Sequence, residues 1–344
     1  MPASPVAEPL ATLDAAIACT ATGPDAAFGL VRGDFEAVNR LIPQQLSSSV
    51  PLIEDIGRHI VSAGGKRLRP LIALLASRLC GHEGVDGPVR LAVVIEFLHT
   101  ATLLHDDVVD HSPLRRGQAT ANTLWGNGPS VLVGDFLYSR AFELMVELDS
   151  MPVMAIISEA TNRVAEGEVM QLANIGNADI DEREYMAIIR RKTAMLFQAS
   201  AHTGAALTGA DAATTAALKN YGLHFGLAYQ LVDDWLDYAG ERDVMGKDAG
   251  NDLAEGKMTL PLIHAARNGS DADARLIRES IAARSASRLP EVLTAVRRTG
   301  ALDHTRECAG MELRRALAAT DNLPPNPYRE GLRTLARFAA SRLA

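Results

Sequence analysis

Two short segments of the chain, DDVVD at 106–110 and DDWLD at 233–237, each carry three aspartates in the same spacing. Residues four apart on a helix share one face, so the first and last aspartate of each motif point the same way. Carboxylates held this close repel one another, and near an apolar core they cost free energy unless a cation joins them. Mg²⁺ accepts such hard oxygen ligands, usually together with water and phosphate groups. The two motifs therefore predict a site where magnesium links the protein to a diphosphate.

The first motif continues a polar stripe along its helix. Steps of three or four residues back from Asp106 pass Leu103 and reach His99 and Glu96, so a histidine and another acid share this face. Two plainer interpretations compete: the acids could be solvated helix ends, and a lone histidine is usually structural. The leucine, valine and aromatic neighbours of both motifs favour the metal site. An EF-hand is disfavoured because its loop needs alternating oxygen ligands, a central glycine and a distal glutamate.

Basic residues gather in segments that could hold phosphate. In GGKRLRP at 64–70, three cations follow a glycine pair and precede a helix, since Pro70 suits a first helical turn. Arg115 and Arg116 follow the first aspartate motif, and arginine offers phosphate a planar fork. Each cation alone is more often a solvated surface charge, but the combination favours a metal-bridged diphosphate, and no Walker or Rossmann motif indicates a nucleotide. The further candidates are Lys192, Thr193, Lys247 and Lys257.

The segments that carry these motifs are predicted to be helical. Alanine and leucine dominate the chain, aromatic residues make up 5%, and alternating β-type runs are scarce. Breaks fall at glycine and proline clusters, and the segments of helical length between them include 89–110, 131–148, 153–173, 182–207 and 212–238. We predict a mobile tail over residues 1–25 and one all-α domain over 26–344. This domain would be a single large helical bundle with a central active-site cavity.

Composition and charge disfavour several classes of protein. The net charge of −8 is unlike the basic footprint of a nucleic-acid-binding protein. Cys19, Cys80 and Cys308 are scattered without a CxxC or other Cys/His spacing typical of zinc sites, which predicts reduced thiols in a cytoplasmic protein. The N-terminus lacks the pattern of a signal peptide, and no apolar stretch reaches the roughly 18 residues of a membrane span. We therefore expect neither nucleic-acid binding nor membrane insertion.

Taken together, the motifs match a known family. The chain resembles the trans-isoprenyl diphosphate synthases, and most closely their bacterial octaprenyl members. Each motif alone is a weak signal, but eight in order are specific, and the resemblance runs from about residue 30 to the C-terminus. The motifs are GGKRLRP at 64–70, FLHTATLLHDDVVD at 97–110, RRG at 115–117, VLVGDFLYSRAF at 131–142, AEGEVMQL at 165–172, KTA at 192–194, AYQLVDDWLDY at 228–238 and GKDAGNDLAEGKMTLPL at 246–262.

The resemblance implies a reaction and a role for each matching residue. The enzyme would use Mg²⁺ to condense isopentenyl diphosphate with an allylic diphosphate of farnesyl size or shorter. Magnesium would bind at Asp106, Asp110 and Asp233, with Asp107, Asp234 and Asp237 completing the catalytic aspartates. Isopentenyl diphosphate would bind at Lys66, Arg69, His99 and Arg116. The allylic diphosphate would bind at Arg115, Lys192, Thr193, Gln230, Lys247 and Lys257.

The resemblance also implies that the product is long and becomes the side chain of a quinone, and that the enzyme is a homodimer. Ala101 and Thr102 lie about one helical turn before Asp106, and shorter-chain relatives tend to carry an aromatic floor there. Their small side chains predict a deep tunnel, although they could simply pack against a neighbouring helix. Phe142 and Met145 are the expected floor lower down. A product of about eight isoprene units is predicted, with seven to ten left open by residue size.

Two rival functions share some of these features. A class I terpene cyclase shares the helical fold and the first aspartate motif, but its second metal motif is usually of an Asn/Ser/Glu type. The aspartates of 233–237 and the cations of 66–69 favour chain elongation instead. A non-catalytic partner subunit would be expected to have lost an acidic or basic motif, and none is missing here.

Overall fold

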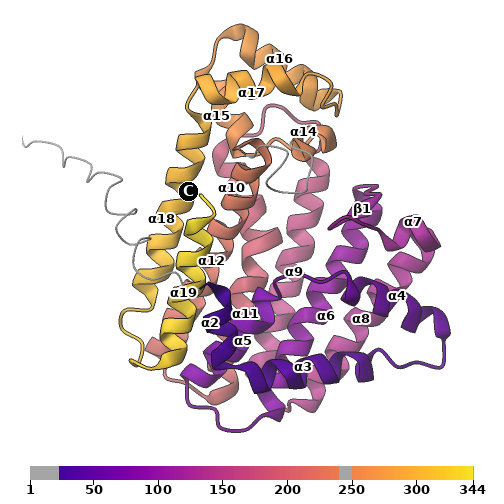
Figure 1. Cartoon of the computed structure of the whole chain (residues 1–344), viewed down its shortest axis with the longest axis vertical. Coiled ribbons are helices and arrows are strands. Elements are labelled where there is room, and N and C mark those ends of the chain that lie inside the picture. The colour runs from indigo at the N-terminus through magenta and orange to yellow at the C-terminus, as the bar shows by residue number, and fades with distance from the viewer. Residues whose placement is uncertain (1–22, 240–249, 344) are drawn as a thin grey trace, which may run out of the picture.

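The computed structural model describes residues 23–239 and 250–343, and the regular structure within them is almost entirely helical (Figure 1). The exception is a short hairpin in which β1 (Leu114–Arg115) pairs antiparallel with β2 (Gln118–Ala119). The all-α prediction is confirmed. The α-helices are α2 Pro24–Leu30, α3 Arg32–Gln45, α4 Pro51–Ser62, α5 Leu68–Leu79, α6 Asp86–Val109, α7 Ala121–Trp125, α8 Asn127–Glu147, α9 Met151–Ala173, α10 Glu182–Ile189, α11 Met195–Thr208, α12 Ala212–Ala239, α14 Asn251–Glu255, α15 Leu260–Asn268, α16 Asp271–Ala282, α17 Leu289–Arg298, α18 Ala301–Ala319 and α19 Pro327–Ser341.

The core of the bundle is formed by long helices that run side by side (Figure 1). Helix α11 packs against α5, α6, α9 and α12, while α6 packs along α8. Contrary to the expectation that no apolar stretch reaches the length of a membrane span, helix α6 is long and apolar enough by length and composition, with a mean hydropathy of 1.3 over its best window. However, 67% of that window is buried inside the bundle, so core packing accounts for its apolar character. This central helix ends at the first aspartate motif.

A π-helical turn interrupts one of the predicted helices. The sequence predicts a continuous helix over 182–207, whereas Arg190–Ala194 forms a π turn between α10 and α11. Helix α12 comes very close to this turn, since a Cβ atom on Gly226 would lie 2.6 Å from Ala194 Cα. Such turns are frequent at functional sites, and this one carries Lys192 and Thr193. The close approach positions both residues against the second aspartate motif.

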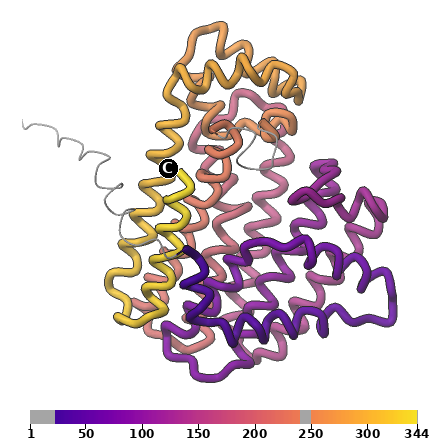
Figure 2. The backbone as a smooth tube through the Cα atoms, in the orientation of Figure 1, coloured from indigo at the N-terminus to yellow at the C-terminus, as the bar shows by residue number. Residues whose placement is uncertain are grey.

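The C-terminal helices close one side of the bundle. Helix α18 packs along α12, and α19 returns to pack on α2 and α5. Figure 2 shows this return, with the yellow end of the chain beside indigo α2. Helix α2 begins at Pro24, and residues 1–22 of the proposed tail lie outside the described residues. The division into a tail over 1–25 and a domain over 26–344 stays a prediction.

Candidate active site

The first aspartate motif lies at the C-terminal end of α6, where two of its carboxylates meet lysines from distant parts of the chain. Lys192 Nζ lies 3.6 Å from Asp106 Oδ2, and Lys257 Nζ lies 2.8 Å from Asp110 Oδ2. Lys192 also contacts Glu168 of α9 at 2.6 Å. Burial, together with the Asp106 carboxylate, raises the pKa of Glu168 to about 7. The crowding of carboxylates here favours the binding of cations.

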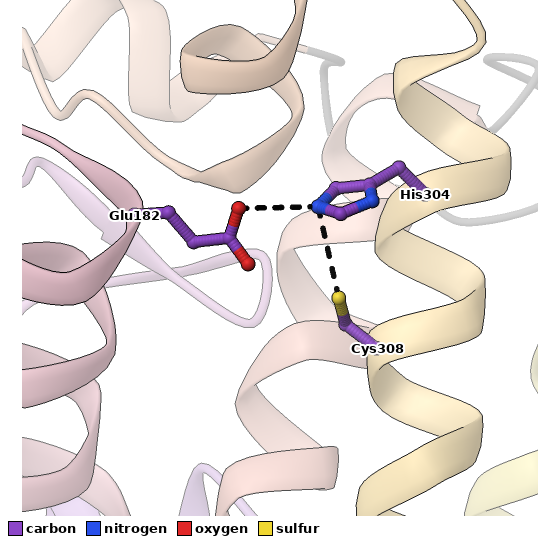
Figure 3. A group of neighbouring side chains, drawn as sticks. All are labelled: Glu182, His304 and Cys308. Atoms are coloured by element: carbon purple, nitrogen blue, oxygen red, sulfur yellow. Dashed lines mark hydrogen bonds and ion pairs between the residues drawn. The ribbon is translucent and has the colours of Figure 1, made fainter. Parts of the chain in front are cut away.

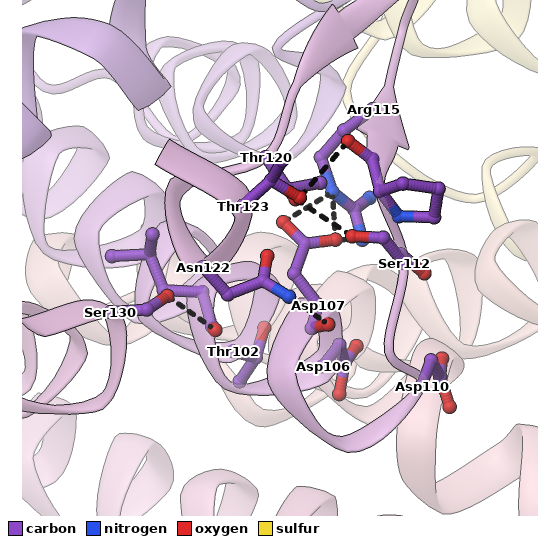
Figure 4. Close-up of polar contacts among 12 residues, drawn as sticks. Thr102, Asp106, Asp107, Asp110, Ser112, Arg115, Thr120, Asn122, Thr123 and Ser130 are labelled. Carbon is purple, nitrogen blue, oxygen red and sulfur yellow. Dashed lines mark hydrogen bonds and ion pairs between the residues drawn. The ribbon is translucent and has the colours of Figure 1, made fainter. Parts of the chain in front are cut away.

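Asp107 points away from the other two aspartates of the motif (Figure 4). Its carboxylate is fully buried and accepts two hydrogen bonds from Arg115 Nε, at 2.9 and 3.1 Å, while Arg115 Nη2 lies 2.7 Å from Oδ1. The Asp107 carbonyl accepts hydrogen bonds from Ser112 N and Asn122 Nδ2. Asp107 and Arg115 therefore fix the hairpin to the end of α6. The predicted contact of Arg115 with the allylic diphosphate stays a prediction.

The second aspartate motif, near the end of α12, divides its three acids in a similar way. Asp233 is half-exposed, with 46% of its side chain accessible, and lies 3.7 Å from Arg342. Asp234 is buried, accepting hydrogen bonds from the Tyr185 hydroxyl and from Gln230 Nε2, and burial raises its pKa to about 7. Asp237 accepts hydrogen bonds from the backbone N–H groups of residues 251 and 252. Thus Asp233 faces outward, whereas the other two hold neighbouring elements.

A pocket lies between the two motifs. Thr193 Oγ1 donates to Gln230 Oε1 at 2.8 Å, and Lys192 Nζ donates to Gln171 Oε1 at 2.6 Å. Although burial opposes it, Glu255 and Asp110 raise the pKa of Lys257, so this side chain is charged. Four of the residues expected to bind the allylic diphosphate line this pocket, while Lys247 lies outside the described residues. The four are Lys192, Thr193, Gln230 and Lys257.

A second pocket gathers the four residues expected to bind isopentenyl diphosphate. Lys66, Arg69, His99 and Arg116 all line it, and Glu96 is the sole acid among its described lining residues. Arg69 stacks on the ring of Phe197 at 4.1 Å, and its Nε is buried without a hydrogen-bond partner. Burial lowers the pKa of Arg69 to about 10, which leaves it charged at neutral pH. An excess of positive charge and an unpaired buried donor suit an anionic ligand.

The glycine pair before these cations has a geometric purpose. Gly65 has φ 142°, and a Cβ atom placed there would lie 2.5 Å from Arg116 Nη1. The Arg116 side chain could move aside, but other residues rarely adopt this φ, so the backbone conformation itself favours glycine at position 65. On the opposite side, Lys66 lies over the ring of Phe338 at 5.0 Å. The C-terminal helix α19 thus helps to shape this pocket.

His99 provides a test of the electrostatics of this pocket. Its Nε2 accepts a hydrogen bond from Arg69 Nη1 at 3.2 Å, and burial, followed by the charge of Arg69, holds its pKa well below 6.5. His99 is therefore neutral in the folded chain, whereas in the unfolded chain it binds a proton once the pH falls below about 6.5. Stability from this group is present above that pH and is lost as the pH falls.

We expect His99→Gln, which keeps an acceptor for Arg69, to weaken the pH dependence of stability. Between pH 6.5 and pH 5, the free energy of unfolding of the wild type should fall by up to about 1.4 kcal/mol per pH unit more than that of the variant. Urea unfolding at several pH values measures both slopes. Equal slopes would show that His99 is not held neutral.

The four residues expected to set product length lie along α6 and α8. Ala101 and Met145 are buried, Thr102 donates a hydrogen bond to the His99 carbonyl at 2.7 Å, and Phe142 stacks on Tyr138 at 5.4 Å. None of the four lines either of the two pockets described above. Their role in chain length stays a prediction.

Several residues that contact the two aspartate motifs were not predicted from the sequence. Glu168 and Gln171 lie within the segment 165–172 that resembles the family, and their spacing of three on a helix is a usable signal. Tyr185 and Arg342 reach the second motif from α10 and from the C-terminal end of the chain. Nothing local in the sequence marks these two residues, because their contacts join distant segments.

Comparison with known proteins gives this arrangement a family. The model of the polyprenyl synthetase family matches residues 50–297, which include all the motifs described above. The chain belongs to this family. It is 49% identical over 314 residues to octaprenyl diphosphate synthase of Escherichia coli K12, covering 91% of this chain and 97% of that protein. It is also 45% identical over 313 residues to all-trans-nonaprenyl-diphosphate synthase of Rhodobacter capsulatus, covering 91% and 96%.

Solved structures of the polyprenyl synthetase family share the whole fold. The chain superposes on a polyprenyl synthase from Caulobacter crescentus, complexed with calcium and isoprenyl diphosphate, with a TM-score of 0.90 and 44% identity, over 94% of this chain and 99% of that one. The match to a decaprenyl diphosphate synthase from Rhodobacter capsulatus has a TM-score of 0.89 and 41% identity, over 93% and 99%. The resemblance noted in the sequence is confirmed, and the chain is an enzyme that transfers prenyl groups.

Proposed function

We propose that this chain uses Mg²⁺ to add isopentenyl diphosphate units to an allylic diphosphate primer, with a product of about eight isoprene units. The observation that carries the proposal is the pair of cation-lined pockets. One contains Lys192 and Lys257 between the two aspartate motifs, and the other contains Arg69 and Arg116. Two anionic substrates could therefore bind at once in separate places, which chain elongation requires.

The donor atoms of the two aspartate motifs suit magnesium. The side chains of Asp106, Asp110 and Asp233 offer only carboxylate oxygens, and Glu168 adds another beside Asp106. We propose that these three aspartates hold the metal together with the diphosphate. When bound, magnesium would neutralise the charge that develops on the departing diphosphate. Lys192 and Lys257, now paired with the aspartates, lie where they could turn to the phosphate oxygens.

The protein residues then act mainly by position and charge. As the allylic C–O bond breaks, Lys192 and Lys257 would stabilise the departing diphosphate electrostatically. Arg69, Lys66 and Arg116 would hold isopentenyl diphosphate so that its double bond attacks the allylic cation. Once the new C–C bond has formed, the resulting carbocation would lose a proton to the released diphosphate. The apolar walls would exclude water, which would otherwise quench the cation.

The test is product analysis with the purified full chain. Labelled isopentenyl diphosphate, farnesyl diphosphate and Mg²⁺ should give a linear polyprenyl diphosphate, and removal of divalent metal with EDTA should abolish its formation. Chromatography after phosphatase treatment measures the chain length. A cyclised hydrocarbon made from the primer alone would indicate a terpene cyclase instead. No product with any primer would favour a non-catalytic subunit.

We expect Ala101→Tyr to shorten the product to three or four isoprene units. Ala101 is fully buried on α6, about one turn before Asp106, so a large ring there would obstruct a chain growing down the bundle. Primer consumption should continue, because the aspartates are untouched. The matched control is Thr102→Ser at the neighbouring position, which should leave the product length unchanged.

Met145→Ala should have the opposite effect and lengthen the product. Met145 is buried on α8, and its truncation would leave space at the proposed floor. Chromatography of labelled products reports both changes. If Ala101→Tyr still made the full-length product at the normal rate, the tunnel would not pass this residue.

We also propose that the enzyme is a cytoplasmic homodimer whose product supplies a quinone side chain. Large apolar side chains are exposed on the neighbouring helices α8 and α9, including Leu132 at 68%, Val146 at 69% and Val169 at 66%. Leu132 and Val146 lie four turns apart on one face of α8, a spacing that suits a contact with another helix. Sedimentation analysis of the purified chain should give twice the monomer mass.

A further inference from the structure

Three metal-binding side chain types converge outside the site described above (Figure 3). Glu182 is the first residue of α10, and His304 and Cys308 lie one turn apart on α18. His304 Nε2 lies 3.2 Å from Glu182 Oε2 and 3.8 Å from Cys308 Sγ, and the donor atoms of the three residues all lie within 4.8 Å of one another. None of the three lines either active-site pocket.

The geometry resembles a ligand set rather than a catalytic relay. In a cysteine–histidine–acid relay, the thiol and the carboxylate contact opposite nitrogens of the imidazole ring. Here both contact the same nitrogen, Nε2, as Figure 3 shows. Tetrahedral zinc bonds place a nitrogen roughly 3.4 Å from an oxygen and 3.6 Å from a sulfur ligand. The observed separations of 3.2 and 3.8 Å lie close to both values.

We propose that Glu182, His304 and Cys308 bind a borderline-soft divalent metal ion of the zinc class. Thiolate and imidazole ligands favour such ions, whereas the all-carboxylate centre of the active site favours magnesium. Three protein ligands leave a fourth position for water. The ring of His264 stacks on His304 at a centroid distance of 4.4 Å and helps to hold the ligand in place.

The surrounding charges also favour a cation. Burial, followed by the carboxylates of Glu182, Glu307 and Glu312, raises the pKa of Cys308 to about 11. The same negative charges that disfavour a lone thiolate attract a divalent ion. Cys308 lies in no typical zinc motif because Glu182 comes from 122 residues earlier in the chain.

Such a metal would join α10 to α18 and so support the active site indirectly. Tyr185 lies one turn after Glu182 on α10, and its hydroxyl holds the buried Asp234 of the second aspartate motif. A bound ion would therefore fix the helix that positions Asp234. Binding should also stabilise the folded chain, because a ligand set drawn from two helices does not exist in the unfolded state.

Cobalt provides a direct probe, because a thiolate bound to Co²⁺ gives a charge-transfer absorption in the near ultraviolet. The full chain in excess Mg²⁺, which occupies the carboxylate centre, is titrated with Co²⁺ and then with Zn²⁺. We expect one Co²⁺ per chain with this absorption, and its displacement by one equivalent of Zn²⁺. In Cys308→Ser the absorption should vanish, and the affinity of Cys308→Ser and His304→Ala for Zn²⁺ should fall at least about 100-fold.

The matched controls are Cys80→Ser and Cys19→Ser, which should keep the absorption and the affinity. Zn²⁺ should also raise the Tm of the wild type and of both controls by about 3 °C or more, but not that of Cys308→Ser. Circular dichroism confirms that each variant is folded. Absence of the absorption in the wild type, or its retention in Cys308→Ser, would overturn the proposal.

Discussion

Replacing Asp106 or Asp233 by alanine should lower turnover by at least about 1,000-fold while the fold stays intact. Each carboxylate belongs to the set that we assign to the metal, so its removal takes away one of the three proposed aspartate ligands. Asp233 is half-exposed, and the carboxylates of Asp106 and Glu168 repel each other, so we expect neither substitution to unfold the chain. Steady-state rates with isopentenyl diphosphate, primer and excess Mg²⁺ measure the effect.

Asp303→Ala is the matched control, because this aspartate is exposed in the first turn of α18. Its turnover should equal that of the wild type. Circular dichroism and thermal unfolding should show native structure in all three variants. Activity within tenfold of the wild type in Asp106→Ala or Asp233→Ala would refute the role assigned to that residue.

Arg69→Ala should raise the KM for isopentenyl diphosphate by about 10- to 100-fold, with a much smaller change for the allylic primer. A charge-assisted hydrogen bond contributes about 1.5–3 kcal/mol, and the Nε atom of the partly buried Arg69 is buried and unpaired. Lys192→Ala should show the reverse preference, because Lys192 lines the pocket between the aspartate motifs. Initial rates with each substrate varied in turn measure both constants.

Arg67→Ala is a useful comparison for Arg69→Ala. Arg67 lines the same pocket, but its guanidinium already contacts Asn39 and lies 3.6 Å from Glu96. Its removal should therefore affect isopentenyl diphosphate less than removal of Arg69 does. Equal increases in KM for both substrates in Arg69→Ala would contradict the assignment of the two diphosphates to separate pockets.

The helices could be predicted from the sequence because their signals are local. The predicted segment 212–238 appears as α12, Ala212–Ala239, and 153–173 appears as α9, Met151–Ala173. Helical periodicity placed Asp106 and Asp110 on one face, and both form ion pairs with lysines that line the first pocket. The sequence could not predict the π turn at Arg190–Ala194, since it depends on the close approach of α12 at Gly226.

The division of labour among the six aspartates was also beyond the sequence. Asp107 and Asp234 follow directly after Asp106 and Asp233, so the motifs alone do not distinguish them. The difference arises from long-range partners, namely Arg115 for Asp107 and Tyr185 for Asp234. Both buried acids hold other elements in place, whereas Asp106 pairs with Lys192 and Asp233 is half-exposed beside Arg342.

The central claim is that both aspartate motifs hold the allylic diphosphate through a shared divalent metal. Calorimetric binding of farnesyl thiodiphosphate, an unreactive analogue of the primer, tests this claim most directly. In the wild type, affinity should rise by at least about 100-fold when Mg²⁺ replaces EDTA. Asp106→Asn and Asp233→Asn should each abolish most of that increase. An affinity that does not depend on Mg²⁺, or one that survives both substitutions, would contradict the account.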